Sequence, residues 1–175
     1  MTRLIAAMLL TALLAPFHAH AADTVADATV VIVVRHAEKG TDDPHDPTLS
    51  DAGRARAEAL AATLAGAGLD AAYTTQYRRT RLTAEPAAKA AGIEVQVRPV
   101  DARTAATYDA DLLREIRALP AGSTVLVVGH SNTVPALVKA FGGAAQAEMP
   151  ETEFDRYSVV VLPADGPARV LVSRY

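Results

Sequence analysis

An arginine and a histidine stand directly after a strongly apolar run near the start of the chain. The run ATVVIVV, residues 28 to 34, leads at once to Arg35 and His36, and a second run, STVLVVG, leads to His130. Continuous β-branched runs are typical of strands that are buried on both faces. Ligands of parallel sheets bind beyond the carboxyl ends of the strands. The sequence therefore predicts that these three side chains meet at one edge of a sheet.

Phosphoryl transfer through histidine is the chemistry that these residue types favour. An imidazole nitrogen can attack phosphorus in line, while fixed cationic and hydrogen-bonding donors hold the equatorial oxygens. Arginine suits the second task because its planar fork binds two phosphate oxygens at once. We therefore predict a site for a phosphorylated substrate that uses Arg35, His36 and His130 and needs no metal ion or cofactor.

A second arginine is expected from the segment TTQYRRTRLTAEP, residues 74 to 86. Arg78, Arg79 and Arg81 lie just past a predicted strand, at the start of a predicted helix. Successive residues on a helix diverge by about 100°, so the three side chains cannot all face the same edge. The spacing alone does not choose among them.

The elements that must position these residues alternate between strands and helices. Strands are predicted over residues 28–34, 69–75, 93–99, 123–130, 157–163 and 168–175. Helices are predicted over residues 50–68, 77–92, 108–122 and 132–143, with a kink at Pro86. Strands separated by helices predict a single α/β domain with a mostly parallel central sheet, covered by helices on both faces.

Four separated motifs resemble those of the histidine phosphatase superfamily, the phosphoglycerate mutase-like proteins. In chain order they are RHAEK, LSDAG, TTQYRRTRLTA and VLVVGHSNT, and the resemblance spans residues 30 to 140. It implies a three-layer, phosphoglycerate mutase-like sandwich. It also implies a histidine-type phosphatase that hydrolyses phosphomonoesters or phosphohistidine, on a small substrate or a phosphoprotein.

The resemblance also implies a role for each residue. His36 corresponds to the histidine that is transiently phosphorylated, and Arg35 to the arginine that binds the phosphoryl oxygens. The family's second arginine lies four residues before a threonine, so Thr83 implies Arg79. The late histidine that follows a glycine corresponds to His130.

A general acid is not evident from the resemblance. Many members supply a glutamate between the second and last motifs, and here only Asp101 and Glu38 are weak candidates. A site without an acid would favour substrates with good leaving groups, since no proton would reach the departing oxygen.

Two other classes of function stay open. The first is a metal-dependent hydrolase that uses His36, Glu38 and His130, and sensitivity to a chelator would favour it. The second is an exported protein that binds a phosphorylated ligand with little or no turnover. The acidic segment around His45, residues 40 to 48, is expected to be a solvated loop at the mouth of the site rather than a metal site.

The composition narrows the setting of the protein. The 175 residues carry a net charge of −3 with no run of Lys or Arg, which argues against a nucleic-acid partner or an anionic membrane surface. The chain has no cysteine, so it can form neither a disulfide nor a thiolate metal site. Residues 1–21 combine a basic start, an apolar stretch and the small-x-small pattern AHA, which predicts a secretory signal peptide. We therefore expect a periplasmic or secreted domain of residues 22–175 without a membrane anchor after cleavage.

Overall fold

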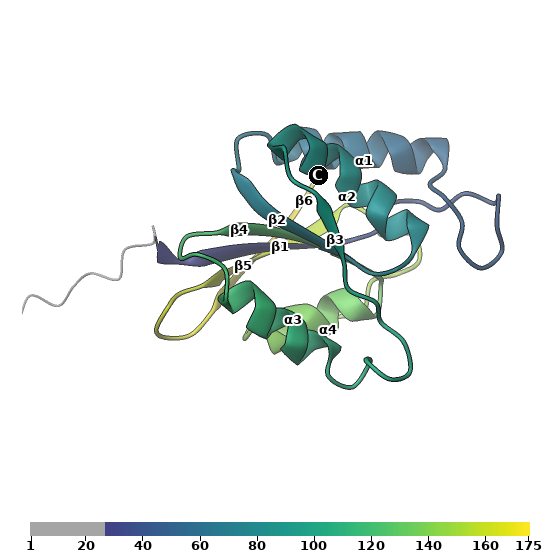
Figure 1. Ribbon diagram of the computed structural model, residues 1–175. Coiled ribbons are helices and arrows are strands. Elements are labelled where there is room, and N and C mark those ends of the chain that lie inside the picture. Colours follow the sequence, from purple (N-terminus) through teal and green to yellow (C-terminus); the bar gives the residue numbers. More distant parts are fainter. Residues whose placement is uncertain (1–26) are drawn as a thin grey trace, which may run out of the picture.

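The computed structural model describes residues 27–175. In it the predicted apolar runs form strands, and most segments between them form helices. The proposed signal peptide therefore lies outside the described residues. Figure 1 shows the arrangement. In chain order the elements are β1 (Thr29–Arg35), α1 (Asp51–Thr63), β2 (Leu69–Thr74), α2 (Arg78–Ala91), β3 (Val95–Val97), α3 (Tyr108–Arg117), β4 (Thr124–Gly129), α4 (Thr133–Ala140), β5 (Arg156–Leu162) and β6 (Arg169–Arg174).

The six strands form one sheet in the order β3-β2-β4-β1-β5-β6. Strands β3, β2, β4 and β1 run parallel to one another, whereas β5 is antiparallel to both β1 and β6. Helices α1 and α2 cover one face of the sheet, and α3 and α4 cover the other (Figure 1). The predicted three-layer α/β sandwich with a mostly parallel sheet is confirmed.

Both faces of the central strands are buried, which explains why their sequences are apolar without alternation. Val31 and Val33 pack on the side of α3 and α4, whereas Ile32 and Val34 pack on the side of α1 and α2. Successive side chains of a strand point to opposite faces, so each face needs its own apolar set. Within residues 27–175, no helix is long and apolar enough to cross a membrane.

The helix ends follow local chemistry, with some differences from the predicted bounds. Ser50 caps α1 by accepting a hydrogen bond from the Gly53 amide, as its position predicts. Helix α2 continues past Pro86 and ends at Ala91, and it is capped by Gly92, whose positive φ of 71° suits glycine. Helix α3 ends at Arg117, five residues before the predicted end, because Pro120 and Gly122 cannot continue it.

The register between β1 and β4 brings the two predicted catalytic segments together. Arg35 is paired with Gly129, and the His36 amide donates a hydrogen bond to the Gly129 carbonyl over 2.9 Å. The next residue on each strand is therefore a histidine at the same edge. A side chain at position 129 would come within 2.7 Å of the Thr133 hydroxyl, which accepts from the His130 amide. Glycine is thus required for this close approach.

Candidate active site

A cavity of about 550 Å³ opens at the carboxyl ends of β1 and β4. All four residues predicted to form the site line it, namely Arg35, His36, Arg79 and His130. A larger groove of about 970 Å³ beside α1 and α2 contains none of them. The tertiary structure therefore places the four predicted residues around one space, and we take this space as the candidate active site.

His36 is held in one orientation and one tautomer. Its Nδ1 lies 2.8 Å from the carbonyl oxygen of Ala37. A carbonyl oxygen only accepts, so Nδ1 carries the hydrogen and the lone pair lies on Nε2. Burial lowers the pKa of His36 to about 4, and the nearby charges of Arg79 and Arg35 act in the same direction. His36 is therefore a neutral imidazole with a free nucleophilic nitrogen at neutral pH.

Arg35 is almost fully buried, at 2% exposure, and is fixed by the segment that precedes β5. Its Nη1 donates to the carbonyl oxygens of Pro150 (2.7 Å) and Glu153 (3.1 Å), and its Nη2 donates to the Glu151 carboxylate (3.0 Å). The guanidinium lies 4.3 Å from the centroid of the Phe154 ring. Among the described residues, its buried Nε has no partner. An unpaired buried donor of this kind suits an anionic ligand, because leaving it unsatisfied costs free energy.

Arg79 is the arginine of its cluster that lines the cavity. Its side chain is only 15% exposed, and its guanidinium lies 4.2 Å from the centroid of the Tyr77 ring and 3.8 Å from Asp46. Arg78, in contrast, is 43% exposed, and Arg81 lines the separate groove. The turn of about 100° per residue along α2 explains this division.

His130 is positioned by side chains that follow β2. Its Nε2 lies 3.0 Å from the Thr75 hydroxyl, and the Tyr77 ring packs edge-on against its imidazole with 5.4 Å between centroids. The His36 and His130 rings are 5.3 Å apart in a T-shaped contact. Burial lowers the pKa of His130 to about 3, and the neighbouring His36 and the two arginines add to this effect.

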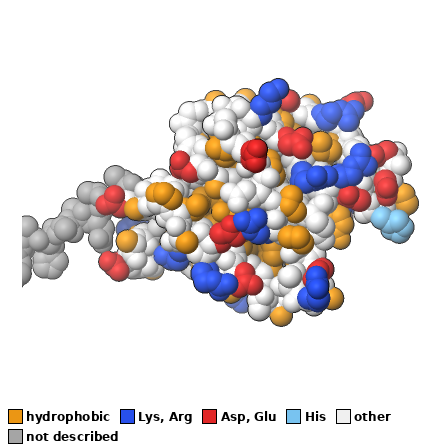
Figure 2. Space-filling view, viewed as in Figure 1, with side chains coloured by type: hydrophobic (Ala, Val, Ile, Leu, Met, Phe, Trp, Pro, Cys, Tyr) orange, Lys and Arg blue, Asp and Glu red, His pale blue; other side chains and the backbone are white. Residues whose placement is uncertain are grey.

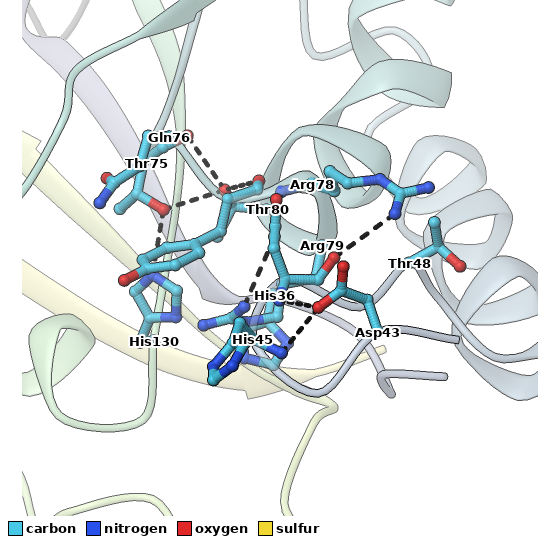
Figure 3. Close-up of polar contacts among 12 residues, drawn as sticks. His36, Asp43, His45, Thr48, Thr75, Gln76, Arg78, Arg79, Thr80 and His130 are labelled. Atoms are coloured by element: carbon cyan, nitrogen blue, oxygen red, sulfur yellow. Dashed lines mark hydrogen bonds and ion pairs between the residues drawn. The ribbon is translucent and has the colours of Figure 1, made fainter. Parts of the chain in front are cut away.

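A short chain of hydroxyl groups supports His130 from behind (Figure 3). Thr75 Oγ1 lies 3.0 Å from Thr80 Oγ1, which lies 2.8 Å from the Tyr77 carbonyl oxygen. When Thr80 donates to this carbonyl, Thr75 can donate to Thr80 and accept from Nε2–H of His130. Nδ1 of His130 then remains for a ligand. An anion in the cavity would raise the pKa of His130, because it would stabilise the charged imidazolium.

This arrangement makes Thr75 a positioning residue. Thr75→Val is expected to lower kcat/KM for a phosphomonoester by about tenfold, since it removes the hydrogen bond that orients His130. Thr63→Val on the exposed end of α1 is the matched control and should leave kcat/KM unchanged. Equal kinetics of the two variants would show that Thr75 does not orient the histidine.

A second threonine connects the nucleophile to α2. The amide of Ala37 donates to Thr83 Oγ1 over 2.9 Å, and this hydroxyl donates to the carbonyl oxygen of Arg79 over 2.8 Å. The backbone next to His36 is thus tied to the first turn of the helix that carries Arg79. This contact explains why a threonine lies four residues after the arginine.

Neither sequence candidate for a general acid lies in the cavity. Both oxygens of the Glu38 carboxylate bind Arg56 of α1, and Arg56 lowers its pKa although burial opposes this. Asp101 accepts hydrogen bonds from the amides of its own turn. The prediction of Glu38 or Asp101 as the general acid is therefore wrong, because both carboxylates are bound outside the cavity.

Two other carboxylates line the cavity instead, Asp109 and Glu151. Neither residue was predicted from the sequence. Asp109 opens a helix that follows a predicted strand, so the same edge argument could have identified it. Glu151 lies in the irregular segment before β5, where no periodic pattern indicates a position.

In the part of the chain that it describes, the structure does not bring together His36, Glu38 and His130 as a set of metal ligands. Within residues 27–175, no three His, Cys, Asp or Glu side chains gather closely enough to hold a metal ion. The Glu38 carboxylate binds Arg56, so it does not join His36 and His130 as a metal ligand. His45 lies in an exposed turn in which the Asp43 carboxylate accepts from its backbone amide. The segment around His45 is thus a solvated loop beside the cavity, as predicted.

The lowered imidazole pKa values predict a specific acid sensitivity. Unfolded histidines titrate near pH 6.5, whereas His36 and His130 titrate at about 4 and about 3 in the folded protein. Between these values the unfolded chain binds more protons, so stability is fully present above pH ~6.5 and is lost as the pH falls toward ~3. We expect the fall in Tm from about pH 7 to about pH 5 to be smaller in His130→Gln than in the parent protein. His45→Gln, which alters an exposed loop, should not reduce this fall.

Comparisons with known proteins agree with the fold. Residues 31–100 match the family model described as the histidine phosphatase superfamily (branch 1). Among the curated proteins, no match was found. The match covers the predicted nucleophile and the arginine cluster, whereas His130 lies beyond it.

Several solved structures share the fold. A Nakamurella multipartitia protein assigned as a phosphohistidine phosphatase, SixA, is 26% identical, with a TM-score of 0.55 over 84% of this chain and 96% of that one. The protein histidine phosphatase SixA complexed with tungstate is 18% identical, with a TM-score of 0.64 over 83% and 96%. A mycobacterial glucosyl-3-phosphoglycerate phosphatase is 15% identical, with a TM-score of 0.62 over 83% and 97%.

These findings confirm the resemblance to the histidine phosphatase superfamily that the four motifs predicted. The family match also agrees with the predicted class of enzyme, a histidine-type phosphatase.

Proposed function

We propose that the chain is a metal-independent phosphatase that forms a phosphohistidine on His36 and then hydrolyses it. The observation that carries this proposal is the hydrogen bond from Nδ1 of His36 to the Ala37 carbonyl. It leaves the Nε2 lone pair free in a cavity that also contains two arginines. A fixed neutral imidazole beside fixed cations is what in-line attack on a phosphoryl group requires.

Each residue has a separate task in this mechanism. Nε2 of His36 attacks phosphorus, and the Ala37 carbonyl stabilises the positive charge that the ring acquires. Arg35 and Arg79 hold the phosphoryl oxygens, since both line the cavity. His130 binds a further oxygen and becomes protonated as the anion enters. Water then attacks the phosphohistidine and releases inorganic phosphate.

The proposed substrates are phosphomonoesters or phosphohistidine, carried by a small molecule or by a protein. The similar structures include both a protein histidine phosphatase and a glucosyl-3-phosphoglycerate phosphatase. On the face seen in Figure 2, Lys and Arg side chains are interspersed with Asp and Glu. Such a mixed surface gives no support for a nucleic-acid partner.

A labelling experiment with the wild-type protein tests the proposal. The mature protein is mixed with a ³²P-labelled activated monoester and quenched within milliseconds to seconds. We expect a transient, acid-labile and base-stable phosphoenzyme, together with release of phosphate. Tight binding of the ester without label or turnover would instead identify a protein that only binds a phosphorylated ligand.

Activity is expected to survive a strong chelator, because arginine and imidazole groups hold the phosphate. The measurement compares kcat/KM before and after dialysis against the chelator. Complete loss of activity that Zn²⁺ restores would favour the metal-dependent hydrolase instead.

We also propose that the protein is exported. The support is the pattern of residues 1–21, with a basic start, an apolar stretch and a small-x-small sequence. N-terminal sequencing of the protein from the periplasm or the medium should find a start near Ala22. Exported protein that still begins at Met1 would contradict cleavage at this position.

A further inference from the structure

The two carboxylates of the cavity are in different electrostatic states. Glu151 accepts a hydrogen bond from the guanidinium of Arg35 over 3.0 Å, an ion pair that favours its ionised form. The Asp109 carboxyl group has no hydrogen-bond or ion-pair partner among residues 27–175. Burial raises the pKa of the Asp109 carboxyl, and no cation opposes this effect. Asp109 is thus the carboxyl group in the cavity that is better able to carry a proton.

The wall that carries Asp109 is fixed by packing. The preceding residue, Tyr108, is 6% exposed and belongs to the core beneath the sheet, together with Leu112 of the next turn. Helix α3 also packs against α4, whose N-terminal residues line the same cavity. Asp109 therefore stands at a defined place in the wall.

The loop that leads to this wall is also held in place. The Gln76 side chain donates to the Val100 carbonyl over 2.9 Å, and its oxygen accepts from the Val100 amide over 3.0 Å. This paired hydrogen bond connects the loop after β3 to the end of β2. Val100 lines the cavity as well. Gln76 thus ties the start of the loop that leads to Asp109 to the segment that leads to Arg79.

We propose that Asp109 is the general acid and base of this site, a role that rests on the phosphohistidine mechanism proposed above. As Nε2 of His36 bonds to phosphorus, the bond from phosphorus to the leaving oxygen breaks. The Asp109 carboxyl gives its proton to that oxygen, so an alcohol departs and a carboxylate remains. In the second step this carboxylate takes a proton from the attacking water. Phosphate leaves, His36 is neutral again and Asp109 is protonated again.

This inference changes the expected class of substrate. Without an acid, the site would act only on esters with good leaving groups. With Asp109 as the acid, it can expel an alkoxide as the neutral alcohol. The proposed substrates are therefore unactivated alkyl or sugar phosphate monoesters rather than phosphoryl groups on good leaving groups.

The test compares leaving groups in Asp109→Asn and in the parent protein. The substrates are p-nitrophenyl phosphate, phenyl phosphate and glycerol phosphate, whose leaving groups become progressively poorer. The measured quantity is kcat/KM, because it reports only steps up to departure of the leaving group. We expect a loss of about 10²-fold or more for glycerol phosphate, in the range typical of general acid catalysis, and a loss below about threefold for p-nitrophenyl phosphate. Retained activity on the activated ester also shows that the variant is folded.

Two further variants serve as controls. Asp101→Asn, in the same connecting segment but outside the cavity, should match the parent for every substrate. Glu151→Gln should not show a loss that grows as the leaving group becomes poorer. The same loss on all three substrates, a leaving-group effect in Glu151→Gln instead, or a parent protein that cleaves only the activated ester would each overturn the assignment of Asp109.

The experiments distinguish failure of the Asp109 role from failure of the proposed phosphohistidine mechanism. If the parent protein forms no phosphoenzyme with any ester, the phosphohistidine mechanism itself fails. If the phosphoenzyme forms but Asp109→Asn shows no leaving-group dependence, only the role of Asp109 fails.

Discussion

Replacing His36 with alanine is expected to abolish turnover and to remove the acid-labile phosphoenzyme. The loss should be at least on the order of 10⁴-fold, since the variant lacks the nitrogen that attacks phosphorus. His130 lies beside it, with 5.3 Å between the ring centroids, but its proposed task is to bind a phosphoryl oxygen rather than to attack phosphorus. Steady-state kinetics and rapid-quench labelling with a ³²P monoester measure the two effects.

The exposed His45 provides the matched control for this prediction. His45→Ala removes an imidazole from the neighbouring loop and should leave both turnover and labelling near those of the parent. Label that persists on the His36→Ala protein would mean that the phosphoryl group is accepted elsewhere, and the assignment of the nucleophile would fail.

The second large effect is expected at Arg79. Arg79→Ala should lower the rate by about 10²-fold or more, as expected when one fixed donor to the reacting group is removed and the nucleophile is kept. The mostly buried guanidinium over Tyr77 lines the cavity, so no solvent-exposed side chain can replace it. The phosphoenzyme should still form, more slowly, in a rapid-quench time course.

Arg78→Ala is the control, because it removes the adjacent arginine, which is exposed and pairs with Asp42. Its activity should be near that of the parent. His130→Ala should resemble Arg79→Ala, since it also removes a donor and leaves His36 in place. If Arg78→Ala lost activity and Arg79→Ala kept it, the assignment of Arg79 to the cavity would be wrong.

The order of strands and helices could be predicted because burial leaves a direct record in the sequence. A strand that is covered on both faces must be apolar at successive positions, as residues 30–34 and 125–128 are. Helix α1 could be predicted from its cap and its apolar stripe, since these are local requirements. The predicted bounds of β3 and of the end of α3 were less accurate. Tertiary contacts decide where an element ends when its sequence pattern is weak.

Some features of the candidate site could also be predicted from local sequence, whereas others depend on long-range contacts. The sequence by itself determined the residue types, since Arg35, His36 and His130 directly follow apolar strands and such strands end at one edge. Only the tertiary structure decided that β1 and β4 are direct neighbours, with Arg35 opposite Gly129. Pairing between strands some 90 residues apart depends on the packing of the whole sheet, which no local pattern encodes.

The same reason explains what the structure added to the site. The helical turn that directs Arg79 into the cavity and Arg78 to solvent depends on where α2 begins. The contacts of Arg35 come from residues 150–154, more than 110 positions away in the chain. The choice between Glu38 and Asp109 as an acid depended on burial and on partners, because a carboxylate becomes a proton donor through its surroundings. Sequence thus determined which chemistry was possible, and the tertiary contacts decided which side chains are placed to perform it.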